Sequence, residues 1–555
     1  MKKTATIIAL WAACSVQAQI LYVNNSDDTY QAVDTKNIEE ITFNEGEQLI
    51  MLRLDNGAIS RFSTSKIESI STATDKREEL TYSLNPDVAF DTDDINNYNE
   101  IVESVITDET NDESGDFVEN YETTRVVTVT FSENGVKTSP AKLDQVTFTA
   151  EGNHLTINSQ RSKVAYLIRG NCSNGSLKIY SLKKFQILAN GITLTNPTGP
   201  AINIQSGKTV YFTITDGTTN NLCDGTVYDL PAKDNNGVEE DQKGTLFSEG
   251  QLIFNGGGTL NVTAKGGHAI CSDDYIRIRS GNINILDAAK DGFRTKDKFI
   301  IGRTVDMSPS ITVNATNNGI DCSEGTFTIE AGRLDIKSGS EAIKVEYEEA
   351  IPDPAIIPDA FIKGGYIKIA TNGEKSSAIK TTGNYTQSGG TIQAEVVGNG
   401  SKIINCDGNV LFSGGKVTAF AKGTVATDTT SAGGIKCNGN LEITGGTIAL
   451  ECNGKGAKGI NCNGNVVVSG GNTVLQTNGE NYTDIADDKK SRAITARSIT
   501  IDNGTVVASA YNHAMAADTG ITINGGRVNA FSTSSTALGM EATQTGGWLL
   551  TKGSE

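Results

Sequence analysis

The sequence predicts an all-β protein built as a parallel β-helix, a solenoid in which short strands stack coil upon coil. A Gly-Gly phrase followed by alternating apolar residues recurs between Gly257 and Ala530, for example at Gly364-Gly365-Tyr366-Ile367. Apolar residues at period two, punctuated by Gly, Asn, Asp, Ser and Thr, are typical of strands and tight turns. Such a repeat cannot bury its apolar face alone and does so on its neighbours.

The first inward apolar position of each repeat defines about eleven regular coils. Successive positions are separated by 22 to 33 residues, and each repeat holds three short strands. A leucine-rich repeat would need a Leu-x-x-Leu-x-Leu pattern, which does not occur. The inward positions are Leu260, Ile283, Ile311, Leu334, Ile367, Ile392, Val417, Ile448, Thr473, Val506 and Val528.

The N-terminus predicts a secretory signal peptide over residues 1–18. Lys2 and Lys3 precede a short apolar run, and small residues end at Ala18. The run is too short to span a membrane, and no later run is apolar enough for a transmembrane segment. We therefore expect an exported protein, secreted, periplasmic or attached to the outer-membrane surface. A lipoprotein acylated at Cys14 is the alternative, although Trp11 is a poor fit to such a signal.

Four further regions follow the signal. Residues 19–72 form a two-fold repeat with a hairpin signal at Asn56-Gly57, which predicts a small β module. Residues 73–124 are acidic, and between 78 and 124 there are fifteen Asp and Glu but no Lys or Arg. This composition favours a solvated linker over a calcium-binding or docking segment. Residues 125–250 are expected to form a cap and first irregular coils, and residues 251–555 the regular coils and C-terminal end.

Charge and cysteine usage narrow the possible partners. The net charge of −19 over 555 residues argues against nucleic acid, because phosphate binding needs a basic face. Four of the cysteines lie at stacked inward positions, which favours a role as small apolar side chains over a role as metal ligands. These are Cys322, Cys406, Cys437 and Cys462. The pairing state of Cys172, Cys223, Cys271 and Cys452 stays open. We expect a monomer.

The block from Gly175 to Asn221 resembles a family of exported bacterial carbohydrate-binding-domain-containing proteins. The resemblance rests on Gly175 to Ser181, Asn196 to Ile204 and Thr213 to Asn220, and it extends less specifically over residues 90–540. It implies a right-handed parallel β-helix related to polysaccharide lyase family nine. It also implies calcium sites and binding of acidic plant polysaccharide such as polygalacturonate.

Charged residues recur at outward positions of the second strand of each repeat. Aligned on inward residues such as Phe293, the positions one and three further on are expected to face solvent. The first column runs Cys271, Arg294, Asp321, Lys344, Lys380, Asn405, Lys436, Asn461 and Thr495. Carboxylates at the adjoining turn stack on three successive coils about 4.8 Å apart and would repel unless a cation intervenes.

Calcium takes roughly six to eight oxygen ligands, and the early coils supply acidic ones. The candidate calcium ligands are Asp273, Asp274, Asp287, Asp291, Asp297, Asp321 and Glu324. The candidate contacts to a ligand carboxylate are Arg294, Lys296 and Lys344. These cations could instead pair with the acids, giving a salt-bridged face without metal. Tyr275 is the candidate aromatic contact, although surface packing also explains an isolated tyrosine.

These observations predict an exported protein that binds acidic polysaccharide through calcium without catalysis. One alternative is a lyase acting by calcium-assisted β-elimination, with Lys296 as the base and Arg294 as the second candidate. Another is a surface adhesin whose flat sheets contact protein. Metal content and the release of unsaturated uronate products would separate these functions.

Overall fold

The protein is almost entirely β-structure. The computed structural model describes residues 20–25, 30–44, 49–55, 58–64, 67–73, 114–233, 237–303, 308–348, 356–427, 430–483 and 488–554. These residues belong to two compact units, one of 102–438 and one of 1–101 with 439–555. The predicted signal peptide, Cys14 and residues 74–113 of the acidic stretch lie outside the described residues.

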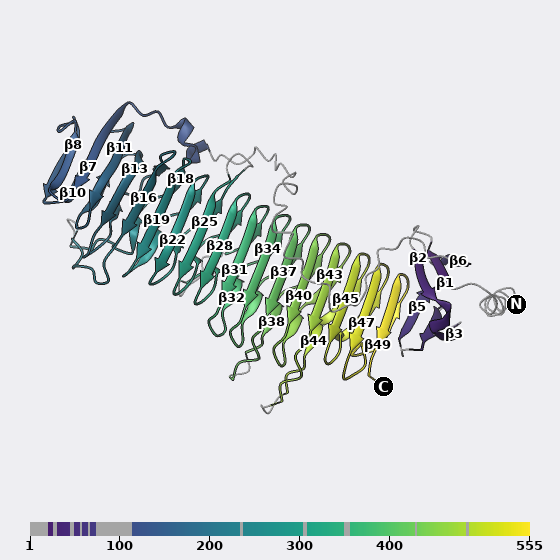
Figure 1. The fold of residues 1–555 in the computed structure, drawn as a ribbon. Coiled ribbons are helices and arrows are strands. Elements are labelled where there is room, and N and C mark those ends of the chain that lie inside the picture. Colours follow the sequence, from purple (N-terminus) through teal and green to yellow (C-terminus); the bar gives the residue numbers. More distant parts are fainter. Residues whose placement is uncertain are drawn as a thin grey trace. The chain divides into compact units, whose positions relative to one another are not determined.

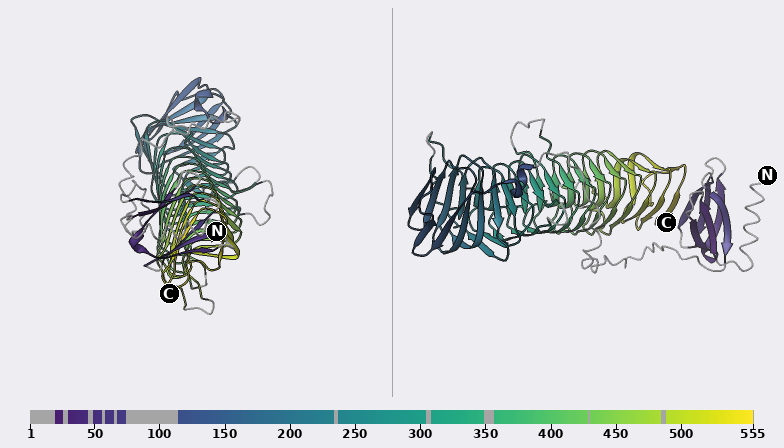
Figure 2. Two further views of the ribbon diagram at one scale, coloured as in Figure 1. Left: turned by 90° about the vertical axis from the view of Figure 1, so that its right-hand side faces the viewer. Right: turned by 90° about the horizontal axis from the view of Figure 1, so that it is seen from above.

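The unit of residues 102–438 is a parallel β-helix whose coils each contribute one strand to three stacked sheets (Figures 1 and 2). The first sheet contains β16 (Thr219–Cys223), β19 (Thr259–Ala264), β22 (Asn282–Ala288), β25 (Ser310–Ala315), β28 (Arg333–Ser338), β31 (Tyr366–Thr371), β34 (Thr391–Val396) and β37 (Lys416–Ala421). Every pairing along this sheet is parallel, as the Gly-Gly repeat predicts.

The second and third sheets follow the first in every coil. The second contains β12 (Ser176–Ser181), β14 (Ile202–Gln205), β17 (Gly244–Ser248), β20 (His268–Ser272), β23 (Phe293–Thr295), β26 (Ile320–Cys322), β29 (Ile343–Val345), β32 (Ser377–Thr381), β35 (Lys402–Cys406) and β38 (Gly433–Cys437). The third contains β15 (Val210–Ile214), β18 (Leu252–Asn255), β21 (Ile276–Ile278), β24 (Phe299–Ile301), β27 (Phe327–Ile329), β30 (Ala360–Ile362), β33 (Tyr385–Gln387) and β36 (Val410–Phe412).

The core consists of the inward residues of these strands. All eleven inward positions that the repeat predicted are at most 1% exposed, which confirms the alignment. The second glycine of the turn has a φ of 75° at Gly365, 68° at Gly390 and 75° at Gly415, a conformation that a side chain would strain. The eight cysteines from Cys172 to Cys462 are free thiols, and the four stacked ones are buried.

Parallel stacking already begins at the first strands of this unit. These are β7 (Arg125–Ser132), β10 (His154–Ser159), β11 (Val164–Cys172) and β13 (Phe185–Thr195). β11 pairs in parallel with both β7 and β13. Two antiparallel partners, β8 (Gly135–Ser139) on β7 and β9 (Val146–Glu151) on β10, cover the edge strands that a solenoid end would otherwise expose.

The unit of residues 1–101 and 439–555 contains further coils of the same kind. Its coil strands are β39 (Leu441–Ile443), β40 (Thr447–Cys452), β41 (Lys458–Cys462), β42 (Asn465–Val468), β43 (Asn472–Thr477), β44 (Arg492–Ile501), β45 (Thr505–Ala510), β46 (Met515–Ile523), β47 (Arg527–Ser532), β48 (Ala542–Gln544) and β49 (Trp548–Lys552). β44 and β46 run through two sheets without a break.

Residues 20–73 of the same unit form six strands. They are β1 (Ile20–Asn25), β2 (Tyr30–Asp34), β3 (Ile38–Asn44), β4 (Leu49–Leu54), β5 (Ile59–Ser63) and β6 (Ile67–Ala73), with a 3-10 turn η1 (Thr35–Asn37). β5 pairs antiparallel with β49, and Trp548 donates a 2.8 Å hydrogen bond to Ser60 Oγ. The module therefore covers the edge of the last coil strand, which the sequence did not predict.

No helix among the described residues has the length and apolar character needed to cross a membrane.

Candidate functional site

The charged face of the early coils lies on the second sheet. Register pairs Cys271 with Arg294, Arg294 with Asp321, and Asp321 with Lys344, which confirms the predicted column. The expectation that this column faces solvent is wrong for two members, since Cys271 and Asp321 are each 1% exposed. The charged side chains of neighbouring coils close over Asp321. Arg294 and Lys344 remain partly exposed.

Three carboxylates converge beside this column. One oxygen each from Asp241, Glu249 and Asp273 lie within 4.8 Å of one another. Asp241 belongs to the long connection before β17, Glu249 follows β17 directly, and Asp273 follows β20 in the next coil. The Nζ atom of Lys243 lies 2.9 Å from an Asp241 oxygen and 2.6 Å from an Asp273 oxygen. We call Asp241, Glu249 and Asp273 the carboxylate trio.

Crowding of negative charge changes the acidity of the trio. Burial, together with Asp273 and Asp241, raises the pKa of Glu249 to about 7. Burial also raises the pKa of Asp273, although Lys243 opposes this effect. Burial alone would lower the pKa of Lys243, but its bonds to Asp273 and Asp241 raise it. The trio therefore holds excess negative charge that one ammonium only partly neutralises.

Glu249 and Asp273 of the trio line a polar pocket of about 480 Å³. The pocket is lined by Lys243, Glu249, Ser272, Asp273, Arg294, Lys296, Ser323 and Glu324. Lys296 pairs with Glu324 at 3.1 Å, and its side chain remains 44% exposed. Two members of the predicted cation set, Arg294 and Lys296, thus lie in one pocket with Asp273 and Glu324.

Arg294 also joins a largely buried network of ion pairs. It lies 2.9 Å from Asp321 and 2.7 Å from Glu348, which also pairs with Lys344. Burial would lower the pKa of Arg294, but Asp321 and Glu348 raise it, so the guanidinium stays charged. Arg294 therefore cannot act as a general base at ordinary pH, because the guanidinium of Arg is effectively always protonated. Its role here is electrostatic.

Asp291 is the second buried acid of this network. Its Oδ2 lies 3.0 Å from His268 Nδ1 and 3.9 Å from Arg294 Nη1. Burial opposes ionisation, but the neighbouring His268 and Arg294 and the hydrogen bond from the Asn318 amide lower the pKa of Asp291. Asp291 and Asp321 are therefore partnered by side chains of the chain itself, and neither belongs to the carboxylate trio.

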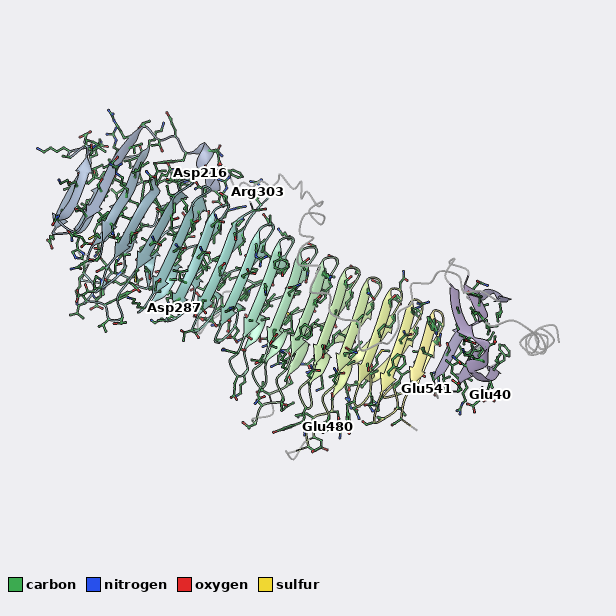
Figure 3. All side chains as sticks on the ribbon, in the orientation of Figure 1. Glu40, Asp216, Asp287, Arg303, Glu480 and Glu541 are labelled. Atoms are coloured by element: carbon green, nitrogen blue, oxygen red, sulfur yellow. The ribbon has the colours of Figure 1, made fainter. Side chains whose placement is uncertain are left out.

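The remaining predicted residues are dispersed. Asp274 and Asp297 stack on successive coils, with the Asp297 amide 3.1 Å from the Asp274 carbonyl, and burial followed by Asp297 raises the pKa of Asp274. Asp287 lies on β22 of the first sheet, away from Arg303 in Figure 3. Tyr275 donates its hydroxyl to Asp116 and lies outside the pocket. Of the seven predicted calcium ligands, only Asp273 belongs to the one converging acidic group of three or more found among the described residues.

Sequence reasoning missed Asp241, Lys243 and Glu249. Asp241 and Lys243 lie at the end of a polar connection that interrupts the repeat, and Glu249 is a turn residue. The available signal was the interruption itself, because long connections on a solenoid often carry the binding residues.

The donor set of the trio fits a hard cation. Carboxylate oxygens are the ligands calcium prefers, and three of them approach one another closely enough to share an ion. Glu249 keeps a pKa of about 7 with Lys243 nearby, so the trio retains capacity for further positive charge. The arrangement brings acidic groups that could hold a cation and basic groups that could hold an anion into one polar pocket.

A parallel β-helix with a mixed-charge pocket on one sheet is the class of protein that the fold and site define. The chain belongs to the family of carbohydrate-binding domain-containing proteins, whose model matches residues 151–480 and 434–537. Its function is therefore related to carbohydrate. Among curated proteins, none matches the chain.

A solved structure of a polysaccharide lyase-like protein from C. thermocellum, studied as a gadolinium derivative, is similar to part of the chain. The identity is 18% and the TM-score 0.37, over 52% of this chain and 97% of that one.

Proposed function

We propose that the protein binds acidic polysaccharide on the second sheet of the early coils, through calcium and without catalysis. The observation that carries the proposal is the pocket in which Glu249 and Asp273 of the trio lie together with Lys243, Arg294 and Lys296. An acidic glycan needs cations to neutralise its carboxylates, and this face can offer both a metal ion and basic side chains.

The residues of the pocket have separable roles in this proposal. Asp241, Glu249 and Asp273 would hold the cation, which supplies a positive charge for a uronate carboxylate. Lys243 would then leave its ion pairs with Asp241 and Asp273 and turn toward the glycan. Arg294 is held in place by Asp321 and Glu348 and presents a fixed guanidinium to the ligand.

Retention on immobilised polygalacturonate, measured across a calcium titration, tests this function. We expect the wild type to bind in calcium and to be released by EGTA. Glu249→Gln and Asp273→Asn should each weaken calcium-dependent binding about tenfold or more, since a contact to a charged group is worth about 1.5–3 kcal/mol. Glu442→Gln is the matched control, because Glu442 is an exposed carboxylate on β39.

Two outcomes would contradict the proposal. Binding that is equal in calcium and EGTA, and equal in the trio variants, would remove the metal from it. No binding under any condition would remove polygalacturonate as the ligand and favour an adhesin.

A lyase is the second candidate, because Lys296 lies in the same pocket as Asp273. Its amine already contacts Glu324 at 3.1 Å and would have to leave that contact to act as a base. Ultraviolet absorbance of unsaturated uronate products decides between the two functions. We expect none to accumulate with the wild type. Product that forms with the wild type and is lost in Lys296→Ala would establish the lyase.

A further inference from the structure

The end of the acidic stretch lies against the third sheet. Residues 114–124 contain two short 3-10 turns, η4 (Ser114–Asp116) and η5 (Val118–Asn120). The Asp116 carboxylate accepts a 3.0 Å hydrogen bond from Arg277, and the Glu119 carboxylate accepts two from Arg279, at 2.8 and 3.3 Å. We call residues 115–124 the acidic strap. Asp116, which is 7% exposed, departs from the solvated linker that the composition predicts, whereas Glu119 and Glu122 remain exposed.

The strap follows one column of outward residues across the strands. Register aligns Gln186, Tyr211, Ile253 and Arg277 on successive coils. Thr123 contacts Gln186 at 3.2 Å, and the rings of Tyr121 and Tyr211 lie 5.1 Å apart. Gly115 accepts a 2.7 Å hydrogen bond from the Tyr211 hydroxyl. The strap therefore runs along the stacking direction, with about one coil every 4.8 Å.

The surface beneath the strap is basic and aromatic. Arg279 and Arg303 both stack on the Phe117 ring, at 4.4 and 4.5 Å from its centroid. Arg277 is 1% exposed and Ile253 fully buried, although both occupy outward positions of their strands. Further along the same column, Phe361 and Thr386 are only half-buried. Ile300 of the same column is also half-buried and Thr328 is 9% exposed, so the strap adds to the burial of Tyr211 and Arg277, which it contacts directly.

Three arginines within two coils repel one another unless anions neutralise them. Guanidinium groups bind planar carboxylates in a two-pronged geometry, and Arg279 holds Glu119 in this way. Tyr211 and Tyr275 add hydroxyl donors that sugar oxygens could accept. A uronate chain laid along the column would meet the same groups that the strap engages.

We propose that the surface formed by Tyr211 and Arg277 of this column, with the neighbouring Arg279 and Arg303, is a second binding site for an acidic polysaccharide chain, occupied here by the acidic strap as an internal substitute. The proposal rests on the proposed function for the class of ligand. The second site differs from the first because it lies on the third sheet, uses other residues and does not need the carboxylate trio.

The two ion pairs of the strap differ in how easily a ligand could replace them. Glu119 is 62% exposed at its side chain, so a ligand can reach its carboxylate from solvent, although its partner Arg279 is only 3% exposed. Asp116 is buried with Arg277, and a buried charge left without its partner is strongly destabilising. A glycan must therefore exchange its own carboxylate for that of Asp116, which keeps Arg277 neutralised throughout.

Binding of polygalacturonate to the full chain in EGTA, at low ionic strength, tests the proposal. EGTA removes the calcium-dependent contribution. We expect weak binding by the wild type, a gain of about tenfold or more in Asp116→Asn/Glu119→Gln, and loss of that gain when Arg279→Gln is added. High salt should abolish the gain, and neutral dextran should show none.

Glu119→Gln alone is the control for misfolding of the double variant, since it alters only an exposed residue. It should show a smaller gain of the same sign, and circular dichroism should match the wild type. Equal affinities for the wild type and both variants would overturn the proposal. So would a gain with polyglutamate that is absent with polygalacturonate, because the site would then recognise peptide.

The two proposals can fail separately. Loss of calcium-dependent binding in Asp273→Asn with an unchanged gain in EGTA supports both. A gain in EGTA without any calcium-dependent binding supports the second site and contradicts the carboxylate trio.

Discussion

The early coils, residues 251–348, and the coils of residues 439–530 share one fold and differ in their outward chemistry. Inward residues of the second sheet are fully buried in both, as at Ile320 and Ile460. The outward column is Arg294, Asp321 and Lys344 in the early coils, whereas Asn461 pairs with Thr495 in the later ones. The repeat therefore preserves the core and leaves the outer face free to vary.

The later coils satisfy their outward polar groups with short amide contacts. Asn440 Oδ1 accepts a 2.9 Å hydrogen bond from the Asn465 amide, and Asn453 accepts one from Asn478 at 2.9 Å. These contacts carry no net charge and need no counter-ion. The comparison shows that the second-sheet column carries interlocking ion pairs in the early coils, whereas the paired Asn461 and Thr495 of the later coils are uncharged.

The largest effect should be common to both regions. Ile320→Ala and Ile460→Ala each remove a fully buried side chain and leave a cavity, so we expect each to lower the free energy of unfolding by about 3 kcal/mol. Urea unfolding followed by circular dichroism measures this. A loss in only one region would mean that the inward column does not support the two sets of coils equally.

A smaller effect, which depends on pH, should be confined to the early coils. Burial raises the pKa of Asp321 to about 6, with Asp291 adding to the rise and Lys344 opposing it. Between about pH 4 and pH 6 the folded protein holds a proton that the unfolded chain has released. The free energy of unfolding should therefore fall by about 2–3 kcal/mol as pH rises through this window.

Unfolding of Asp321→Asn across the same pH range is the test of that assignment. The variant should lose this part of the slope, because the amide does not titrate. Asp502→Asn, which changes an exposed carboxylate of a later coil, should retain it. An unchanged slope in Asp321→Asn would assign the pH dependence to another group.

The smallest effect concerns the amide contacts. Asn261 donates to Asn221 at 3.0 Å and accepts from Asn284 at 2.9 Å in a partly buried ladder, so Asn261→Ala should cost about 1 kcal/mol. Asn453 is exposed, so Asn453→Ala should cost less than about 0.5 kcal/mol. Equal losses in urea unfolding would show that burial does not set the value of these contacts.

The predictable part of the site followed from the repeat. Because strands stack in register, aligning Phe293 with Ile320 was enough to place Arg294 beside Asp321. The burial of Asp321 was not predictable, since Arg294 from β23 and Lys344 from β29 close over it together. Tyr275 was the predicted aromatic contact to the ligand, but its hydroxyl turns to Asp116. That contact joins residues 159 positions apart, which no local pattern encodes.

The sequence alone determined the β-helix, because period-two apolar residues and Gly-Gly turns leave few other ways to bury the repeat. Only the tertiary structure decided where charge gathers. Asp241, Glu249 and Asp273 come from a connection and two successive coils, and Asp116 meets Arg277 from a segment outside the repeat. The core obeys a period that local sequence carries, whereas these groups meet through connections that have none.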